Sequence, residues 1–100
     1  MSAYLVGIQT VVDNDALNQY VKAALPSMKA YGAKPLAVDP NTVKLEGNRE
    51  PPGSRCVIIE FESRKHLLAW YDSDEYKSAM ALRDGALDGY ALIAEGLPTK

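Results

Sequence analysis

The sequence predicts an α+β domain with a ferredoxin-like arrangement, in which an antiparallel sheet carries its helices on one face only. The predicted elements follow the order strand, helix, two strands, helix pair, strand. A chain of 100 residues is long enough for one core and too short for two, so residues 1–100 are expected to form a single domain. The predicted strands carry apolar side chains on both faces, and one layer of helices covers only one of them. We therefore expect a homodimer, in which a second copy covers the other face.

The first part of the chain predicts a strand followed by a helix. The strand runs from Ala3 to Val12 and is rich in β-branched and aromatic residues. The helix begins at the capping candidates in residues 13–15 and ends before Gly32, a typical terminator. Pro26 is expected to kink this helix or to restart its last turn. Apolar residues at spacings of three and four predict a buried stripe of Leu17, Tyr20, Val21, Ala24 and Met28.

The middle of the chain predicts strands separated by a loop. Residues 34–38 and 42–47 read as strand pieces on either side of a turn, and they form either one bent strand or two. Adjacent prolines and a glycine make residues 48–54 a loop. The clearest strand runs from Arg55 to Glu62. Its alternation puts Val57, Ile59 and Phe61 on one face and Cys56, Ile58, Glu60 and Glu62 on the other.

The last part predicts two helices and a final strand. Ser63 is expected to cap a short helix that ends at Tyr71. Residue 72 or 73 caps a second helix, which runs to about residue 84 or 87, where two glycines act as stop signals. Residues 90–95 form the last strand. We assign four residues of the strands to the face without helices, namely Leu5, Val11, Cys56 and Ile58.

Composition and charge exclude several classes of function. The 11 basic and 13 acidic residues are scattered and leave a net charge of −2, which disfavours nucleic acid as a partner. No basic leader precedes the first strand and no stretch is apolar enough to span a bilayer, so we expect no membrane partner. The lone Cys56 rules out a disulfide framework within one chain and fits a cytoplasmic location. Since no glycine-rich phosphate loop occurs either, we expect no cofactor.

Arg83 is the first candidate for a functional residue. It interrupts an apolar helix stripe that also contains Tyr76, Ala79 and Met80. A guanidinium there is suited to clamp an anion, because its planar fork matches a carboxylate. Two structural roles stand beside this one. Arg83 either lies along the helix surface with its charge in water, or forms an ion pair with Glu60 or Glu46.

Four further residues complete the candidate ligand-binding set. Glu60 lies in a strand otherwise suited to burial, on the side assigned to the barrel interior, and either acts on a ligand or pairs with an arginine. Glu46 is a weaker candidate, because strand ends are often simply solvated. His66 is the only histidine and lacks a partner for a metal site, so we expect no metal. Trp70 either anchors the junction of the two helices in the core or lines the mouth of a pocket.

Several segments of the chain resemble the family called domain of unknown function 1330. These are residues 31–38, "LEG" at 45–47, Arg55, "VIIEF" at 57–61 with Ser63 beyond it, "AWYDSDEYKSAMALR" at 69–83, and the final "EG" at 95–96. Two positions depart from the family pattern. Ala33 and Lys34 stand where a second glycine and an arginine are common, and Glu62 stands where a proline is common.

The resemblance implies a dimeric α+β barrel, within a superfamily that includes cofactor-free monooxygenases, muconolactone isomerase-like enzymes and haem-binding members. By that analogy, haem binding through His66 is a remote alternative. We expect the homodimer to bind a small organic molecule in a barrel or cleft. The sequence does not decide whether this molecule is acidic. Arg83, Glu60 and Tyr76 would be its polar contacts. The chemistry, if there is any, would be a cofactor-free proton transfer or oxygenation, and the alternative is a non-catalytic ligand sensor or a purely structural dimer.

Overall fold

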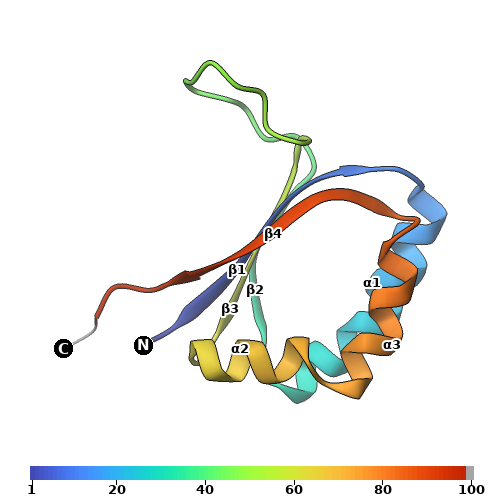
Figure 1. Cartoon of the computed structure of the whole chain (residues 1–100), viewed down its shortest axis with the longest axis vertical. Coiled ribbons are helices and arrows are strands. Elements are labelled where there is room, and N and C mark those ends of the chain that lie inside the picture. The colour runs from blue at the N-terminus through green and yellow to red at the C-terminus, as the bar shows by residue number, and fades with distance from the viewer. Residues whose placement is uncertain (99–100) are drawn as a thin grey trace.

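The structure is a computed structural model that describes residues 1–98. It contains an antiparallel sheet with its helices on one face, as the sequence predicts (Figure 1). The elements in chain order are β1 (Ala3–Val11), α1 (Asn14–Ala30), β2 (Lys34–Asp39), β3 (Arg55–Phe61), α2 (Arg64–Tyr71), α3 (Asp74–Arg83) and β4 (Leu87–Glu95). Within residues 1–98, no helix is long and apolar enough to cross a membrane.

The four strands are ordered β2-β3-β1-β4, and every neighbouring pair is antiparallel. The two central strands, β1 and β3, pair along almost their whole length, with Leu5 opposite Ile59 and Tyr4 opposite Glu60. Residues directly opposite each other point to the same face of a sheet. This register therefore determines which side chains of each strand face the helices.

All three helices begin with the capping side chains that the sequence predicts. The carboxylate of Asp13 accepts hydrogen bonds from the backbone N–H groups of residues 15 and 16 at the start of α1. Ser63 and Ser73 accept the same kind of bond at the starts of α2 and α3. These contacts satisfy N–H groups that have no partner within the helix, so each cap places a helix start at a defined residue.

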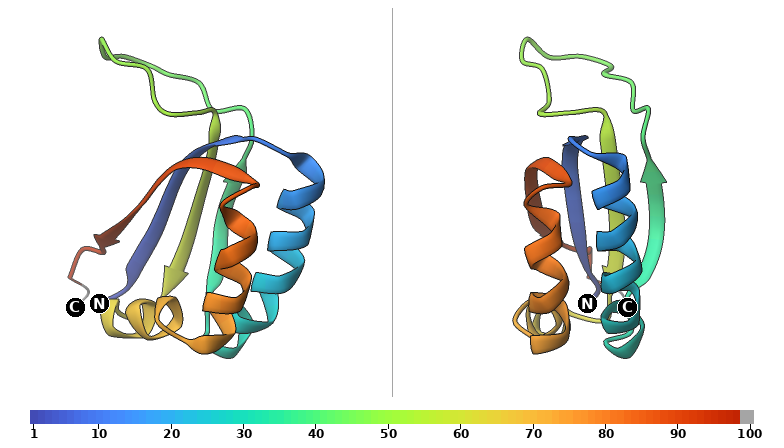
Figure 2. Two further views of the ribbon diagram at one scale, coloured as in Figure 1. Left: turned by 45° about the vertical axis from the view of Figure 1, so that its right-hand side comes forward. Right: turned by 90° about the vertical axis from the view of Figure 1, so that its right-hand side faces the viewer.

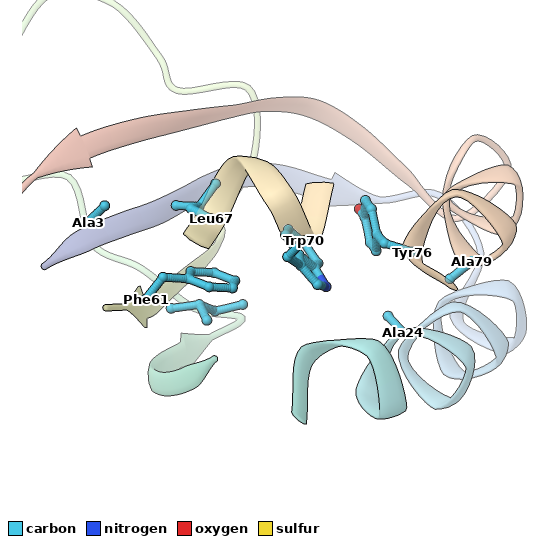
Figure 3. Packing of buried hydrophobic residues seen from close by; sticks show 8 residues of the cluster. Ala3, Ala24, Phe61, Leu67, Trp70, Tyr76 and Ala79 are labelled. Carbon is cyan, nitrogen blue, oxygen red and sulfur yellow. The ribbon is translucent and has the colours of Figure 1, made fainter. Parts of the chain in front are cut away.

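The main core lies where α2 meets the sheet and the first turn of α3. Phe61, Trp70 and Tyr76 are almost fully buried and follow one another in Figure 3. The ring centroids of Trp70 and Tyr76 are 4.0 Å apart, and those of Phe61 and Trp70 are 5.3 Å apart. Such tilted aromatic pairs combine a large buried area with a favourable ring geometry. The core is thus concentrated at one end of the sheet.

The other end of the sheet is less tightly covered. Helices α1 and α3 pack along each other, whereas few close backbone contacts join either of them to the strands. Figures 1 and 2 show both helices inclined away from the sheet. The connections from β1 to α1 and from α3 to β4 close this end, where the backbone N–H of Val12 donates to the carbonyl of Ala86.

Two predicted strand boundaries are wrong. Residues 42–47 do not form a strand; they belong to an exposed loop over residues 40–54 that projects beyond the sheet (Figure 1). β4 starts at Leu87 and not at residue 90, because Gly89 does not end it. Gly89 has φ 147° and lies inside the strand, where it allows β4 to approach β1 closely. The glycine therefore marks an irregularity within a strand and not its boundary.

The assignment of two residues to the face without helices is also wrong. Leu5 pairs with Ile59 and Val11 pairs with buried Leu87, so both lie on the helix side of the sheet. Cys56 and Ile58 lie on the other side, as predicted, and their partners there are Ile8 and Val6. We call this side the open face; it comprises Tyr4, Val6, Ile8, Cys56, Ile58, Glu60, Tyr90 and Leu92.

Candidate functional site

A cavity of about 140 Å³ occupies the space between the sheet and helices α1 and α3. We call it the helix–sheet cavity. Most of its lining is aliphatic or aromatic, and all the charged and amide groups come from Gln9, Arg55 and Arg83. The lining includes Leu5 and Gln9 from β1, Tyr20 and Met28 from α1, Arg55 and Ile59 from β3, Trp70 from α2, and Tyr76 and Arg83 from α3. A largely apolar cavity with a few convergent polar groups is the usual form of a small-molecule site.

Arg83 begins a chain of hydrogen bonds that crosses from α3 to α1. Its Nη1 donates to the hydroxyl of Tyr76 at 3.2 Å. The Tyr76 hydroxyl lies 2.8 Å from the hydroxyl of Tyr20, and the two rings meet edge to face. Tyr76 is 1% exposed, whereas Tyr20 is only partly buried. The chain thus leads from a charged group, through a buried hydroxyl, to a hydroxyl beside the cavity.

Arg55 and Gln9 form a second polar pair on the sheet side of the cavity. Nη1 of Arg55 donates to Oε1 of Gln9 at 2.8 Å. Gly7 leaves room for this arrangement, because a Cβ at that position would lie 2.9 Å from both Nε2 of Gln9 and a methyl group of Val57. A side chain at position 7 would therefore displace Gln9 from its present place.

Neither cavity arginine has a carboxylate partner within the part of the chain that the structure describes. The ion pairs found there involve Lys44, Arg64, His66 and Lys77. The ion pair of Arg83 with Glu60 or Glu46, one of the alternatives that the sequence left open, does not form. Two partly buried guanidinium groups thus share one cavity with only neutral hydrogen-bond partners.

Burial and neighbouring charges shift the pKa values of three cavity groups. Burial raises the pKa of the Tyr76 hydroxyl far above its ordinary value, and the nearby Tyr20 raises it further. Burial lowers the pKa of Arg55. Burial also disfavours the charge of Arg83, but the hydroxyl groups of Tyr76, Tyr71 and Tyr20 outweigh it and raise the pKa of Arg83. At neutral pH both arginines therefore remain charged, and Tyr76 keeps its proton.

A second hollow, more polar than the first, adjoins Arg83. It shares Gln9, Arg83 and Leu87 with the helix–sheet cavity, and its own lining adds Asp84 and Asp88. Both aspartates are exposed, and neither forms an ion pair with Arg83. Carboxylates therefore line this hollow, while the lining of the helix–sheet cavity contains none.

The structure brings together three of the six residues that the sequence singles out. Arg83, Tyr76 and Trp70 line the helix–sheet cavity. Trp70 also fulfils the structural role considered for it, because its Nε1 donates to the hydroxyl of Ser27 at 3.1 Å in the buried interior. The indole is thus both part of the core and part of the cavity wall.

The other three candidates lie elsewhere. Glu60 is on the open face, where the hydroxyl of Tyr4 donates to it at 3.3 Å. Glu46 is exposed in the projecting loop. His66 is exposed on α2, with its Nδ1 2.7 Å from the hydroxyl of Ser63 and its Nε2 3.6 Å from a carboxylate oxygen of Glu62. Within residues 1–98 no group of His, Cys, Asp and Glu is arranged to hold a metal ion.

The site also contains residues that the sequence did not single out for it. Gln9, Tyr20 and Arg55 supply half of its polar groups. Alternation offered a signal for two of them, since Gln9 shares a face with Leu5, and Arg55 shares a face with Val57 and Ile59. A polar side chain on the apolar face of a strand points toward a buried site.

Comparison with known proteins places the chain in a family. The profile of the family described as domain of unknown function (DUF1330) matches residues 2–97. The chain belongs to this family. A search of curated proteins gives no match. Family membership therefore confirms the resemblance seen in the sequence and leaves the activity to be inferred from the site.

Solved structures confirm the fold of this DUF1330 member. RPA0582, a protein of unknown function from Rhodopseudomonas palustris, superposes with a TM-score of 0.78 at 15% identity, over 98% of this chain and 84% of that one. HapK from Hahella chejuensis gives 0.65 at 14% identity, over 98% and 95%. A Bacteroides fragilis protein, described as dimeric, of unknown function and of ferredoxin-like fold, gives 0.61 at 11% identity, over 95% and 96%.

Proposed function

We propose that this protein is a cytoplasmic homodimer that binds a small organic anion in the helix–sheet cavity of each subunit. The observation that carries the proposal is the presence of two partly buried guanidinium groups without a carboxylate partner in an otherwise apolar cavity. A partly buried charge is costly unless a counter-charge compensates it. An anionic ligand in the cavity would supply that counter-charge to both Arg83 and Arg55. The lone Cys56 supports a reducing location.

The open face supports the homodimer. Val6, Ile8 and Ile58 form a continuous apolar surface at its centre, and no helix of residues 1–98 covers it. Tyr90 and Leu92 of β4 extend this surface and are 49% and 53% exposed. Apolar patches of this kind are typical of protein interfaces. A second copy packed sheet against sheet would bury the patch, and the similar protein from Bacteroides fragilis is described as dimeric.

A reaction within this cavity would depend on a ligand that is already acidic. No Asp, Glu, His or Lys side chain lines the helix–sheet cavity, so its walls hold no ordinary general base. Two cations stabilise an enolate or phenolate that arrives deprotonated, and such an anion is the kind of substrate that cofactor-free oxygenation requires. Proton transfer would instead need Asp84 or Asp88 of the adjoining hollow.

The same observation favours a second candidate function, a non-catalytic ligand sensor. Such a protein needs an anion-binding cavity but no general base, and the lining of the helix–sheet cavity fits that description. Replacing Asp84 and Asp88 together by Asn tests whether the protein catalyses proton transfer. Proton-transfer chemistry would be lost in this variant, whereas ligand affinity would remain within about twofold, because neither aspartate lines the cavity itself.

The proposal is tested by native mass spectrometry and by the substitution Arg83→Leu. The protein purified without added ligand is expected to be a dimer, and any retained small molecule would show as extra mass. Arg83→Leu is expected to abolish binding of organic acids while the dimer and the unfolding temperature remain nearly unchanged. Arg49→Leu in the exposed loop removes the same charge outside the cavity and should leave binding intact.

Two results would contradict the proposal. Unfolding of Arg83→Leu would show that the guanidinium has a structural role. Equal binding of organic acids by Arg83→Leu and the wild type would show that the cavity is not the binding site.

A further inference from the structure

The hydrogen-bond chain on the helix side of the cavity has a direction. A guanidinium donates and never accepts, so the oxygen of Tyr76 must accept the bond from Arg83. Tyr76 is then free to donate its own proton to the oxygen of Tyr20, which lies 2.8 Å away. In that arrangement the proton of Tyr20 has no partner within the chain of bonds. Each donated bond polarises the next, so the charge of Arg83 strengthens Tyr20 as a donor.

The sheet side of the cavity is also rich in donors. Arg55 has five N–H groups, of which one is bonded to the acceptor oxygen of Gln9. That bond uses one of the two lone pairs of the Gln9 oxygen and leaves the Gln9 amide N–H groups available. Donors therefore outnumber acceptors around the cavity, which suits a ligand group that has several lone pairs and no proton. A carboxylate, enolate or phenolate oxygen meets this requirement.

The two sides face the same cavity. Tyr20 from α1 and Arg55 from β3 both line it, and Arg83 of α3 lines it beside Tyr76. Tyr20 is also the more accessible of the two hydroxyls, since Tyr76 is almost fully buried. A ligand entering the cavity would therefore meet Tyr20 and Arg55 directly, with Tyr76 behind Tyr20.

The apolar part of the cavity limits the rest of the ligand. Leu5, Met28 and Ile59 and the neighbouring aliphatic side chains surround a space of about 140 Å³. A volume of this size holds about ten non-hydrogen atoms, on the basis of the space that one water molecule requires. A ring with a short substituent or an unbranched chain of medium length would fill it, whereas a long acyl chain would not.

We propose that the ligand is an organic monoanion with an apolar body, about ten non-hydrogen atoms in all, whose oxyanion accepts hydrogen bonds from Tyr20 and Arg55. This inference rests on the function proposed above and specifies both the contacts and the class of ligand. It makes Tyr20 a ligand-binding residue, and it assigns Tyr76 the role of linking Tyr20 to the charge of Arg83.

The test measures the affinities of matched probes through the fluorescence of Trp70, the only tryptophan, which lines the cavity. The probes are octanoate, benzoate, butanoate, hexadecanoate and the neutral octan-1-ol. Wild-type protein should prefer octanoate or benzoate over butanoate and hexadecanoate. Tyr20→Phe should weaken binding of the preferred acid by about tenfold, which is the usual effect of losing one hydrogen bond to a charged group. Its affinity for octan-1-ol should not change.

Substitutions at Arg55 test the second contact. Arg55→Gln should weaken binding of the preferred acid by at least about tenfold, and Arg55→Lys should keep part of the affinity because it retains the charge without the planar fork. Tyr4→Phe on the open face and Arg49→Gln in the loop are matched controls and should bind like the wild type, because neither residue lines the cavity or the adjoining hollow. Thermal unfolding of each variant confirms that it is folded.

The outcomes separate this inference from the proposed function. If Arg83→Leu abolishes acid binding but Tyr20→Phe and Arg55→Gln do not weaken it, the inference is wrong and the proposed function stands. An equal loss of octan-1-ol binding in Tyr20→Phe would also overturn it, because that result indicates a structural role for the hydroxyl. If wild-type protein binds none of the acids, both fail.

Discussion

The two faces of the sheet are built from the same strands and differ in what covers them. On the helix side, Ile59 and Phe61 are buried by α2 and its neighbours, yet the same side carries Gln9, Arg55 and a cavity. The open face has no cover within residues 1–98 and is the more uniformly apolar of the two at its centre. The apolar character of a strand face therefore does not show whether helices of the same chain cover it. It shows only that the face needs a partner, either in the same chain or in a second copy.

The polar groups of the two faces also differ in their hydrogen-bond partners. On the open face, the carboxylate of Glu60 accepts a hydrogen bond from Tyr4. On the helix side, Arg55 and Arg83 have only neutral partners. We therefore propose assembly through the open face and ligand binding on the helix side.

The largest expected effect is the loss of stability caused by Phe61→Ala, on the helix side of the sheet. Phe61 is fully buried and packs against Trp70, so its truncation removes a large apolar side chain and leaves a cavity. We expect the free energy of unfolding to fall by about 3–5 kcal/mol, much of the stability of a domain of this size. Chemical denaturation measures this change, and a loss below about 1 kcal/mol would contradict the described core.

The next effect concerns the open face, where Ile58→Lys would put a charge at the centre of the proposed interface. An unpaired buried charge is costly, so the dimer should dissociate at least about a hundredfold more readily, while each subunit stays folded. Analytical ultracentrifugation measures the change. Ser78→Lys on the exposed side of α3 is the control and should remain dimeric. A wild-type protein that is monomeric would refute the role of this face.

A smaller loss of stability is expected from Gly89→Ala, in strand β4. Gly89 has φ 147°, a conformation that side chains disfavour, and an added Cβ would collide with the carbonyl oxygen of Ile8. We expect a loss of about 1–3 kcal/mol in the free energy of unfolding. Gly85→Ala is the matched control, since a Cβ there meets nothing. Equal stability of the two variants would show that β4 does not approach β1 as described.

The smallest effect is a dependence of the free energy of unfolding on alkaline pH, and it comes from Tyr76 on the helix side of the sheet. Burial raises the pKa of Tyr76 above its unfolded value, so the folded protein holds that proton when the unfolded chain has lost it. This contribution to stability is present below about pH 10 and is lost as the pH rises above it. Tyr76→Phe should therefore lose less stability than the wild type between neutral and strongly alkaline pH. Chemical denaturation at a series of pH values measures this difference, and an equal loss of stability in the two proteins would contradict the burial of the Tyr76 hydroxyl.

The elements of this fold are readable in the sequence because local interactions specify them. Capping side chains such as Ser63 act within the first turn of the helix that they begin. The alternation of side chains along β3 likewise separates the two faces of that one strand. The ferredoxin-like arrangement followed from these local patterns, whereas the family followed from the resemblance of segments such as residues 69–83. The reading was wrong at residues 42–47, where short apolar runs resemble a strand but pair with no neighbour.

The faces and the site depend on contacts between distant segments, which no local pattern contains. Alternation divides β1 into two sets of side chains, but only its pairing with β3 shows that Leu5 lies on the side of the helices. In the same way, Arg83 and Trp70 reach one cavity with Tyr20 and Arg55 only after α1 and α3 pack together beside the sheet. Residue type and periodicity thus made Arg83 a candidate. The packing of helices against the sheet provided its neighbours and separated it from Glu60.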